Sequence, residues 1–551
     1  MEPATTLPAP TDTEPLDGSR RRRARLADTL LGALAGLAAA LAGLAVAEVV
    51  AAVVQDAQSP VLDVADRVVD GAPIWLKDLA IDWFGTNDKV ALLVGIAVLL
   101  AAYAALVGVI GLARRRLLGI IAIGVGVSLF GLAGAYASQS TRRDAPWAAA
   151  VPSLVGAAVA VGVLIGLRHL FRTRPATATT QADGADTTTG ATAVAGDGGS
   201  RRRFLVGLGT TAAGAAVVGA AGRRLGSGSG AAASRADLVL PRASAPLPAA
   251  PADVAVGVDG AVPFFTPNAD FYRIDTAITV PRVPIDGWEL AVDGMVERPR
   301  TLDFEELTSR ELVEADITMT CVSNEVGGDL AGTARWLGVR LDDLLDEVGV
   351  DPDADQIVGH SVDGYTCGFP LAALDGRDAL VAVGMNGEPL PLEHGYPARL
   401  VVPGLYGYVS ATKWLERIEL TRFDRFDQYW VERGWDETAP IKLASRIDTP
   451  RGLATLEPGT VAIAGVAWAQ TRGVERVEVQ IDDGDWVEAD LAEELNVDTW
   501  RQWSLPWEAT EGRHTIRVRA IEKGGPIQTA ERAEPFPSGA TGRHQIVVIV
   551  R

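Results

Sequence analysis

The sequence predicts a multi-domain protein with N-terminal transmembrane helices, an α+β domain and a C-terminal β-sandwich. Three observations carry this prediction. The first part of the 551-residue chain holds apolar stretches long enough to cross a bilayer. The middle mixes helical and strand-like segments, and the end alternates apolar and polar residues in short runs. A chain of this length is also too long for one compact core.

Charge is distributed unevenly along the chain. The net charge is −20, and residues 1–230 carry 21 basic and 17 acidic side chains, whereas residues 231–551 carry 29 basic and 53 acidic ones. Because an acidic surface repels phosphate backbones, we exclude nucleic acid as a partner. The two cysteines are too few for a disulfide scaffold or a four-cysteine metal site.

Residues 1–172 are predicted to form a four-helix transmembrane region. The stretches that approach the roughly 20 apolar residues needed to cross a bilayer are about 29–54, 90–112, 117–138 and 147–170. Arginines precede the first stretch, separate the second from the third and follow the fourth, so these sides are predicted to be cytoplasmic. Residues 1–230 contain one histidine, His169, which argues against a haem between the helices. A transporter remains an alternative, although the stretches lack paired charges.

The next segments are predicted to be connectors. Residues 173–200 form a Thr, Ala, Gly and Asp tract without a hydrophobic period, which predicts a disordered linker. Residues 201–222 begin with three arginines before a weakly apolar run, as a twin-arginine-like export or anchor segment does; an ordinary fifth span is the alternative. Residues 223–261, rich in Ser, Ala, Pro and Gly, predict a flexible tether.

The α+β domain is predicted over residues 262–437. The segment 303–306 has capping-box spacing and predicts a short helix. The apolar residues between Leu341 and Val348 recur at helical spacing, and the strand-like segment 317–320 runs directly into Cys321. Helices and strands are therefore expected to alternate in this domain.

Residues 438–551 are predicted to form the β-sandwich. Apolar residues alternate with polar ones at 477–481 and again at 516–520. The acidic segment 482–485 resembles a cation-binding loop, but it lacks the spaced ligands and distal glutamate of a calcium site. We therefore expect a hairpin turn there.

Cys321 is the most informative residue for function. It follows a β-branched strand and enters a small, polar loop with two glycines, where backbone N–H groups could approach a ligand. A thiolate in such a place suits a soft metal. From the residue alone a buried spectator thiol is the alternative, because free cysteine is among the most buried residue types.

Several motifs, in this order, resemble those of the sulfite-oxidase-like molybdopterin-dependent oxidoreductases. They are 266–273 (TPNADFYR), 320–324 (TCVSN), 334–341 (ARWLGVRL), 386–391 (NGEPLP), 394–399 (HGYPAR) and 412–415 (TKWL). Residues 441–448 then introduce a segment that resembles the family's immunoglobulin-like dimerisation domain. The resemblance covers about residues 260–551, and nothing comparable is found over 1–230.

The resemblance implies that Cys321 is the thiolate ligand of molybdenum in a molybdopterin cofactor. It also implies the cofactor-binding residues, which are Asn268, Asp363, His394, Arg399, Ala411, Thr412 and Lys413. The charge of Arg399 and Lys413 suits this role, because the pterin's terminal phosphate needs cations inside an acidic protein. A surface salt bridge is the alternative for each of these two cations.

The chain departs from the true sulfite oxidases near the expected metal. Pro267 stands where they carry an arginine, and Glu325 ends a loop that usually ends in arginine. Since an oxyanion needs positive charge at the metal's open face, these changes weaken the case for sulfite as the substrate. Besides Cys321, the candidate catalytic residues facing the substrate are Tyr272, Arg273, Asn324 and Trp435.

The implied activity is a two-electron oxygen-atom transfer to or from a small substrate. We expect a multi-pass protein of the cell membrane with an extracytoplasmic catalytic domain, a separate cytochrome or quinone-linked redox partner, and a homodimer through the C-terminal domain. A sulfoxide-type reductase and a non-enzymatic exported surface module are the alternatives. Cys367 is expected to be a spectator thiol, because a disulfide with Cys321 would remove the metal ligand.

Overall fold

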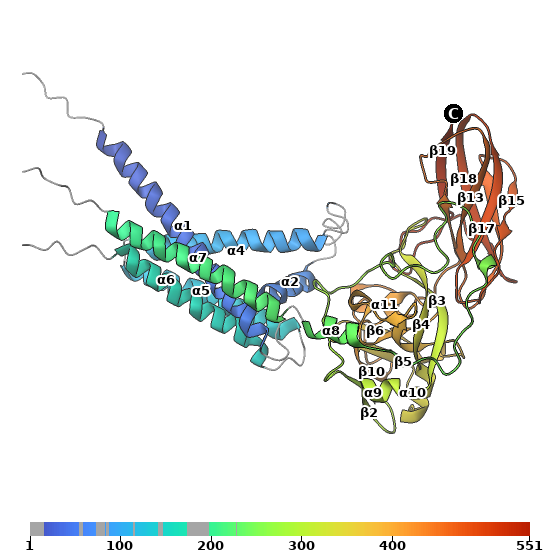
Figure 1. The fold of residues 1–551 in the computed structure, drawn as a ribbon, viewed down its shortest axis with the longest axis horizontal. Coiled ribbons are helices and arrows are strands. Elements are labelled where there is room, and N and C mark those ends of the chain that lie inside the picture. Colours follow the sequence, from blue (N-terminus) through green and yellow to red (C-terminus); the bar gives the residue numbers. More distant parts are fainter. Residues whose placement is uncertain are drawn as a thin grey trace, which may run out of the picture. The chain divides into compact units, whose positions relative to one another are not determined.

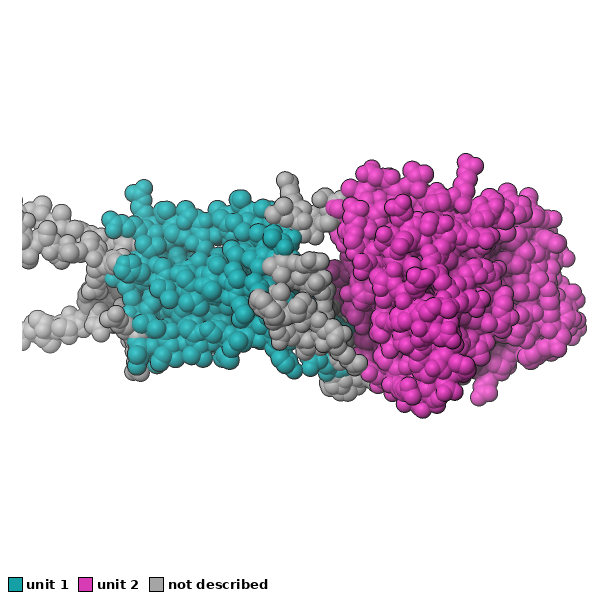
Figure 2. Space-filling view, turned by 90° about the horizontal axis from the view of Figure 1, so that it is seen from below, with its two compact units in different colours: residues 1–229 teal, residues 230–551 magenta. Residues whose placement is uncertain are grey.

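The computed structural model describes residues 16–53, 59–72, 83, 88–113, 116–141, 147–172, 198–226 and 229–551. These residues form two compact units, 1–229 and 230–551 (Figure 1, Figure 2). Of the predicted disordered linker, residues 173–197 lie outside the described part of the chain, and residues 198–200 begin helix α7.

The first unit is built from long helices (Figure 1). They are α1 (Leu16–Ala51), α2 (Pro60–Gly71), α4 (Asp88–Leu112), α5 (Arg116–Thr141), α6 (Val151–Arg172), preceded by the 3₁₀ turn η2 (Trp147–Ala150), and α7 (Gly198–Gly226). The parts long and apolar enough to cross a membrane are Leu26–Ala51, Val90–Leu112, Leu117–Ser138, Val151–Arg172 and Arg202–Gly222. The four predicted stretches are thus helical, with ends shifted by a few residues, and the fifth segment is a helix of the same kind.

Small residues allow these helices to approach one another closely. A Cβ atom added at Gly43 of α1 would lie 2.6 Å from the carbonyl oxygen of Gly156 in α6. Gly36 of α1 has no room for a Cβ atom against the backbone of Ala104 in α4. If the helices lie in a bilayer, such contacts hold them together through van der Waals packing, because lipid provides no hydrophobic drive between helices.

The second unit begins with two five-stranded sheets. The first, in the order β2-β1-β10-β5-β6, contains β1 (Glu289–Gly294), β2 (Arg300–Asp303), β5 (Gln356–Ser361), β6 (Thr366–Pro370) and β10 (Leu415–Thr421). The second, in the order β3-β4-β7-β8 with β9 paired to β7, contains β3 (Leu312–Thr320), β4 (Ala331–Arg340), β7 (Leu380–Met385), β8 (Glu388–Pro389) and β9 (Arg399–Val401). Short helices accompany the sheets: α9 (Phe304–Thr308), α10 (Leu341–Val348) and α11 (Gly407–Ser410), with 3₁₀ turns at Leu371–Ala373, Leu392–His394 and Val431–Arg433.

Local signals in the sequence explain several of these elements. The Asp303 carboxylate accepts from Glu306 N at 2.7 Å, and the Glu306 side chain accepts from Asp303 N, so the expected capping box opens α9. Helix α10 buries the apolar face that the spacing predicts. Strand β3 runs into Cys321, as expected.

Residues 229–261 differ from the predicted flexible tether. Helix α8 (Ser229–Asp237) and the 3₁₀ turn η3 (Ala252–Val254) lie in this segment. The Arg235 guanidinium donates to the backbone oxygens of Leu390 at 2.8 Å and Pro389 at 2.9 Å, and Ser244 N donates to Leu312 O. These contacts could not be predicted from the sequence, because they satisfy backbone groups of the folded unit. They do not bury an apolar face, so they leave no hydrophobic period in the sequence.

The end of the chain forms two more sheets that share one hydrophobic core. One has the order β11-β13-β17-β16, with β11 (Ala444–Thr449), β13 (Gly459–Trp468), β16 (Asp490–Leu491) and β17 (Arg501–Ala509). The other has the order β12-β19-β18-β14-β15, with β12 (Thr455–Leu456), β14 (Val474–Ile481), β15 (Trp486–Glu488), β18 (Gly512–Glu522) and β19 (Gln545–Val550). Val479 of β14 pairs with Val518 of β18, and both are fully buried. The expected hairpin turn joins β14 to β15. An immunoglobulin-like topology stays a prediction.

Candidate functional site

Cys321 lies where strand β3 ends and the chain turns back toward β4. Its backbone N–H donates to Leu330 O at 2.9 Å, and its carbonyl accepts from Asn324 N at 3.1 Å. The Asn324 side-chain oxygen accepts from Leu330 N at 2.9 Å. These hydrogen bonds join the two ends of the 321–330 loop. The thiol, on a residue that is 7% exposed, is therefore held at the base of a closed loop.

A pocket lies beside Cys321 and contains about 780 Å³ of space not filled by protein atoms. The predicted site residues that line it are Tyr272, Cys321, Asp363, His394, Arg399, Ala411 and Lys413. The fold therefore brings together residues that are up to 141 positions apart in the sequence.

Arg399 is a buried cation at this pocket. It is 4% exposed, and its guanidinium donates to His394 O at 3.0 Å and lies 5.1 Å from the ring centre of Trp336. Within the described residues no carboxylate forms an ion pair with it. Burial lowers the pKa of Arg399 to about 10, so it stays charged near neutral pH. A buried charge without a counter-ion is costly, which indicates that an anion belongs here.

Lys413 is the second cation of the pocket, and it already has a partner. Its ammonium group lies 2.9 Å from a carboxylate oxygen of Asp275, which also accepts from Arg273 at 2.8 Å. Asp275 is 4% exposed. Burial lowers the pKa of Lys413 to about 8, against the opposing attraction of Asp275. The three charges form one cluster, in which a single carboxylate neutralises part of the positive charge.

His394 connects the first predicted cofactor loop to Arg399. Its Nε2 donates to the backbone oxygen of Asn268 at 3.2 Å, and its own carbonyl accepts from Arg399. Burial, aided by the nearby Arg399 charge, lowers the pKa of His394 to about 4, so the ring is neutral near pH 7. A neutral ring beside two cations adds no further positive charge to the pocket.

Two acidic groups of the pocket wall hold their protons more tightly than usual. Burial raises the pKa of Asp363, whose carboxylate accepts from Tyr365 N at 3.1 Å. Burial also raises the pKa of the Tyr272 phenol, so this hydroxyl remains a hydrogen-bond donor in the physiological range. Both groups are suited to contacting a polar ligand in a largely dehydrated site.

Five predicted site residues do not line the pocket: Asn268, Arg273, Asn324, Thr412 and Trp435. The Asn268 amide donates to Met385 O at 3.3 Å and accepts from the Asn386 amide at 2.9 Å, which fixes its loop. Arg273 extends to Asp275, and Asn324 closes the cysteine loop. Trp435 packs on Phe536 with ring centres 5.3 Å apart. Its aromatic neighbour Trp430 lies in the pocket wall instead.

Four residues that the sequence did not predict also line the pocket: Asp275, Met319, Tyr365 and Trp430. The position of Tyr365, two residues after the predicted cofactor-binding residue Asp363, could have indicated it. Trp430 lies five residues before Trp435, and the sequence does not show which of the two indoles faces the pocket.

The two cysteines are both buried and free. Burial raises the pKa of the Cys321 thiol, whereas its hydrogen bonds with Ser323 and the charge of Lys413 act to lower it. The Cys367 thiol lies 2.6 Å from the Thr412 hydroxyl, and burial raises its pKa to about 11. The disulfide considered from the sequence is therefore absent, and Thr412 contacts Cys367 rather than the pocket.

The residues at this pocket fit a molybdopterin cofactor. A soft thiol at the wall provides a metal ligand, and Arg399 provides a buried cation that lacks an ion-pair partner within the described residues. A phosphate group would supply that missing negative charge, and Lys413 lies in the same wall. Arg399, Lys413 and His394 would hold the pterin side of the cofactor.

The C-terminal sheets hold the strand and the loop that carry Cys321. Strand β3 is at the edge of its sheet. Its Thr318 N donates to Asp498 O at 3.0 Å, and Thr318 O accepts from the Gln470 amide. On the loop, Gly328 O accepts from Arg446 at 2.9 Å. The edge strand is thus covered by the following domain, which restricts movement of the cysteine.

The site fits a metal cofactor that carries a phosphate group, and comparison with known proteins identifies the family of the chain. Residues 277–430 match the model described as "Oxidoreductase molybdopterin binding domain". Human mitochondrial sulfite oxidase is 30% identical over 316 residues, which cover 48% of this chain and 57% of the human protein. The chain thus spans little more than half the length of that relative. The uncharacterised oxidoreductase YuiH of Bacillus subtilis (strain 168) is 34% identical over 148 residues, covering 27% of this chain and 72% of YuiH.

This chain belongs to the sulfite-oxidase-like family of molybdopterin-dependent oxidoreductases. It is a molybdenum-dependent oxidoreductase whose cofactor is molybdenum bound by molybdopterin. Among solved structures, the sulfane dehydrogenase SoxCD from Paracoccus pantotrophus has a TM-score of 0.47 and 21% identity, over 54% of this chain and 85% of that chain.

Proposed function

We propose that this chain is a membrane-anchored enzyme of two-electron oxygen-atom transfer, with Cys321 as the protein ligand of its molybdenum. The observation that carries the proposal is the free, buried thiol of Cys321 in the wall of a pocket that also contains Arg399 and Lys413. When bound, the cofactor supplies the exchange of an oxygen atom and two electrons with the substrate. The chain supplies ligation, orientation and charge.

Each residue of the pocket has a distinct task in this proposal. Arg399 and Lys413 bind the phosphate end of the cofactor. His394 keeps Arg399 in place through its carbonyl and stays neutral. Tyr272 donates a hydrogen bond toward the substrate side, where its phenol stays protonated. The aromatic wall, including Trp430, excludes water from the reacting atoms.

A second candidate, reduction of a sulfoxide-type substrate, is favoured by the charge of the pocket. Lys413 and Arg273 both bind Asp275, and the cofactor phosphate uses the charge of Arg399. Little positive charge then remains for a dianion such as sulfite. An uncharged oxygen donor suits this site better, because it needs hydrogen-bond donors rather than counter-ions.

The membrane part of the proposal concerns topology and partners. The helices of residues 1–226 would anchor the enzyme, with the catalytic unit on the extracytoplasmic side, as the placement of arginines supports. A cytochrome or a quinone-linked protein would be the separate redox partner. The C-terminal sheets would form an immunoglobulin-like sandwich that joins two copies of the chain, which the motif at 441–448 supports.

The test uses the full chain purified from a host that makes molybdopterin. We expect about one molybdenum per chain, as one cofactor per site requires, and turnover of either sulfite or an uncharged sulfoxide. Cys321→Ser should abolish turnover while the protein remains folded. Cys367→Ser is the matched control, because it changes the other buried thiol, and it should retain metal and activity. Full activity of Cys321→Ser, or a metal-free wild-type protein, would refute the proposal.

A further inference from the structure

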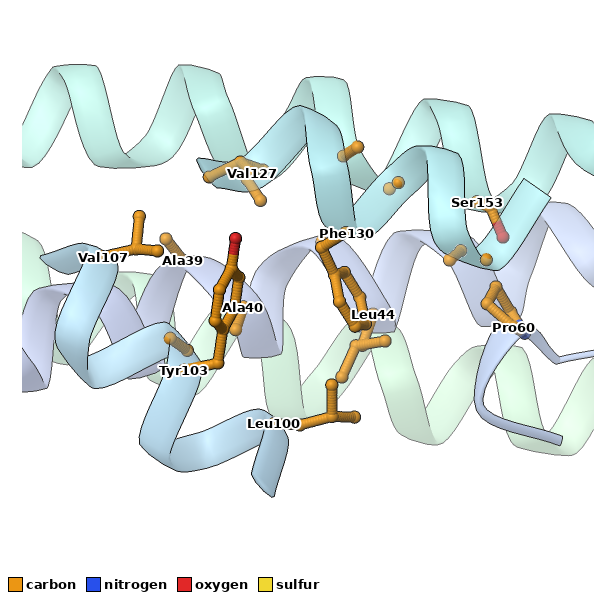
Figure 3. Close-up of a pocket in the computed structure, with 18 of the residues that line it drawn as sticks. Ala39, Ala40, Leu44, Pro60, Leu100, Tyr103, Val107, Val127, Phe130 and Ser153 are labelled. Carbon is orange, nitrogen blue, oxygen red and sulfur yellow. The ribbon is translucent and has the colours of Figure 1, made fainter. Parts of the chain in front are cut away.

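The first unit contains a pocket that the oxidoreductase chemistry does not use. It lies between helices α1, α4, α5 and α6, with Pro60 of α2 at one end (Figure 3). About 760 Å³ in and around it, including space open to the surroundings, is not filled by protein atoms. The described residues that line it are almost all Gly, Ala, Val and Leu, and none of them is charged. Such a wall suits a long hydrocarbon chain.

One end of this pocket contains a polar group without a partner. The hydroxyl of Ser153 at the start of α6 is buried, the residue is 6% exposed, and Oγ makes no hydrogen bond to any described residue. Ser153 lines the pocket beside Pro60 (Figure 3). A buried hydroxyl without a partner is costly, particularly in lipid. It therefore indicates a ligand with a hydrogen-bond-accepting oxygen at this end.

The middle of the pocket is flanked by two aromatic rings, those of Tyr103 in α4 and Phe130 in α5 (Figure 3). The Tyr103 hydroxyl already donates to Gly126 O at 2.7 Å, so the tyrosine offers its ring rather than a free donor. Flat rings of this kind pack against planar, conjugated groups as well as against hydrocarbon chains.

The geometry points to a lipoquinone, a neutral quinone ring with an isoprenoid tail, as the occupant of this pocket. A ring carbonyl would accept from Ser153, and the tail would lie along the small residues of α1 and α6. A phospholipid fits less well, since none of the described residues in the wall offers a cation for its phosphate. The inference rests on the proposed function for its meaning, because each oxygen-atom transfer releases or consumes two electrons. A quinone takes up two electrons and two protons to become a quinol, and the quinol gives them back when it is oxidised.

The polar end of the pocket lies at the end of the bundle from which the chain continues to the second unit. Gly156 of α6 would place a Cβ atom 3.0 Å from Cβ of Ala47 in α1, so the start of α6 lies against the end of α1. Gly222, near the end of α7, would place one 2.9 Å from Val49 N in α1. Ser153 and the last turn of α7 are therefore at the same end of α1.

The experiment measures quinone bound to the full chain. Protein purified from membranes is extracted, and its quinone and phospholipid are quantified against chain concentration; a short-tailed quinone is then titrated by quenching of tyrosine and tryptophan fluorescence. We expect wild-type protein to retain quinone. Ser153→Ala should weaken binding about three- to ten-fold, because it removes one neutral hydrogen bond.

Ala40→Phe fills the pocket and should abolish retention of the quinone. Leu41→Phe is its control, because residue 41 is on the same helix and is 55% exposed outside the pocket. If Ala40→Phe misfolds, the titration of Ser153→Ala still decides. Phospholipid without quinone in the extract, or equal quinone binding by wild type and both pocket variants, would overturn the inference. Cys321→Ser should bind quinone like wild type, so failure at the molybdenum site is distinguishable from failure here.

Discussion

Gly327, in the loop that follows Cys321, offers a prediction whose size follows from the structure. Its φ angle is +85°, a region that L-residues with a side chain disfavour. A Cβ atom there would lie 2.9 Å from Cε1 of His544 and closer still to two other ring atoms. His544 cannot easily move, because its Nδ1 accepts from Ile447 N at 3.0 Å. Burial lowers the pKa of His544 to about 4, which keeps the ring neutral and able to accept.

Gly327→Ala should therefore destabilise the second unit by two additive effects. The backbone strain costs about 1–2 kcal/mol, and the forced overlap with His544 costs about 1–3 kcal/mol. The total is about 2–5 kcal/mol, and because the loop holds Cys321, the molybdenum content should fall as well. Gly287→Ala is the matched control: its φ is +78°, and a Cβ atom there meets nothing within 4 Å, so only the strain of about 1–2 kcal/mol applies.

The assay is urea unfolding of the full chain, followed by tryptophan fluorescence, together with metal analysis. Gly327→Ala should unfold at a lower urea concentration than Gly287→Ala. In the double variant Gly327→Ala/His544→Ala, the overlap is removed. Its loss of unfolding free energy should therefore be clearly smaller than the sum of the losses in the two single variants. Equal destabilisation by the two glycine variants, or strict additivity with His544→Ala, would refute the reasoning about this contact.

Two further predictions concern local interactions. Asp303→Ala removes the capping box of α9 and should lower the free energy of unfolding by about 0.5–2 kcal/mol, as measured by urea unfolding; an unchanged midpoint would contradict it. His514 lies 2.9 Å from Asp482, and this hydrogen bond raises the pKa of His514. A histidine whose pKa is higher in the folded state than in the unfolded state stabilises the fold at pH values below its unfolded-state pKa. This stabilisation is lost as the pH rises through the folded-state pKa. Asp482→Asn should therefore lower the thermal midpoint more at pH 6 than at pH 9, and the opposite order would contradict the assignment.

The parts of the structure that the sequence predicted well have local causes. The capping box at Asp303, the apolar face of α10 and the alternation of β14 are each encoded within a few residues. The end of β3 at Cys321 belongs to the same group. Long apolar stretches likewise predicted the helices of the first unit that are long and apolar enough to cross a membrane.

The parts that could not be predicted depend on contacts between distant segments. The contacts of Arg235 with the backbone at 389–390 turn a presumed tether into a folded segment. The choice of Trp430 over Trp435 for the pocket wall depends on packing against Phe536, more than one hundred residues later. The pairing of Lys413 with Asp275 likewise joins residues 138 positions apart. Periodicity and motif spacing carry no information about such contacts.

We propose that the sulfur of Cys321 binds molybdenum directly. X-ray absorption at the molybdenum edge, measured on the full chain and on Cys321→Ser, tests it without reference to a substrate. We predict that the serine variant retains the pterin sulfurs and loses one molybdenum–sulfur contact, whereas Cys367→Ser keeps the wild-type spectrum. An unchanged sulfur shell in Cys321→Ser would contradict the claim.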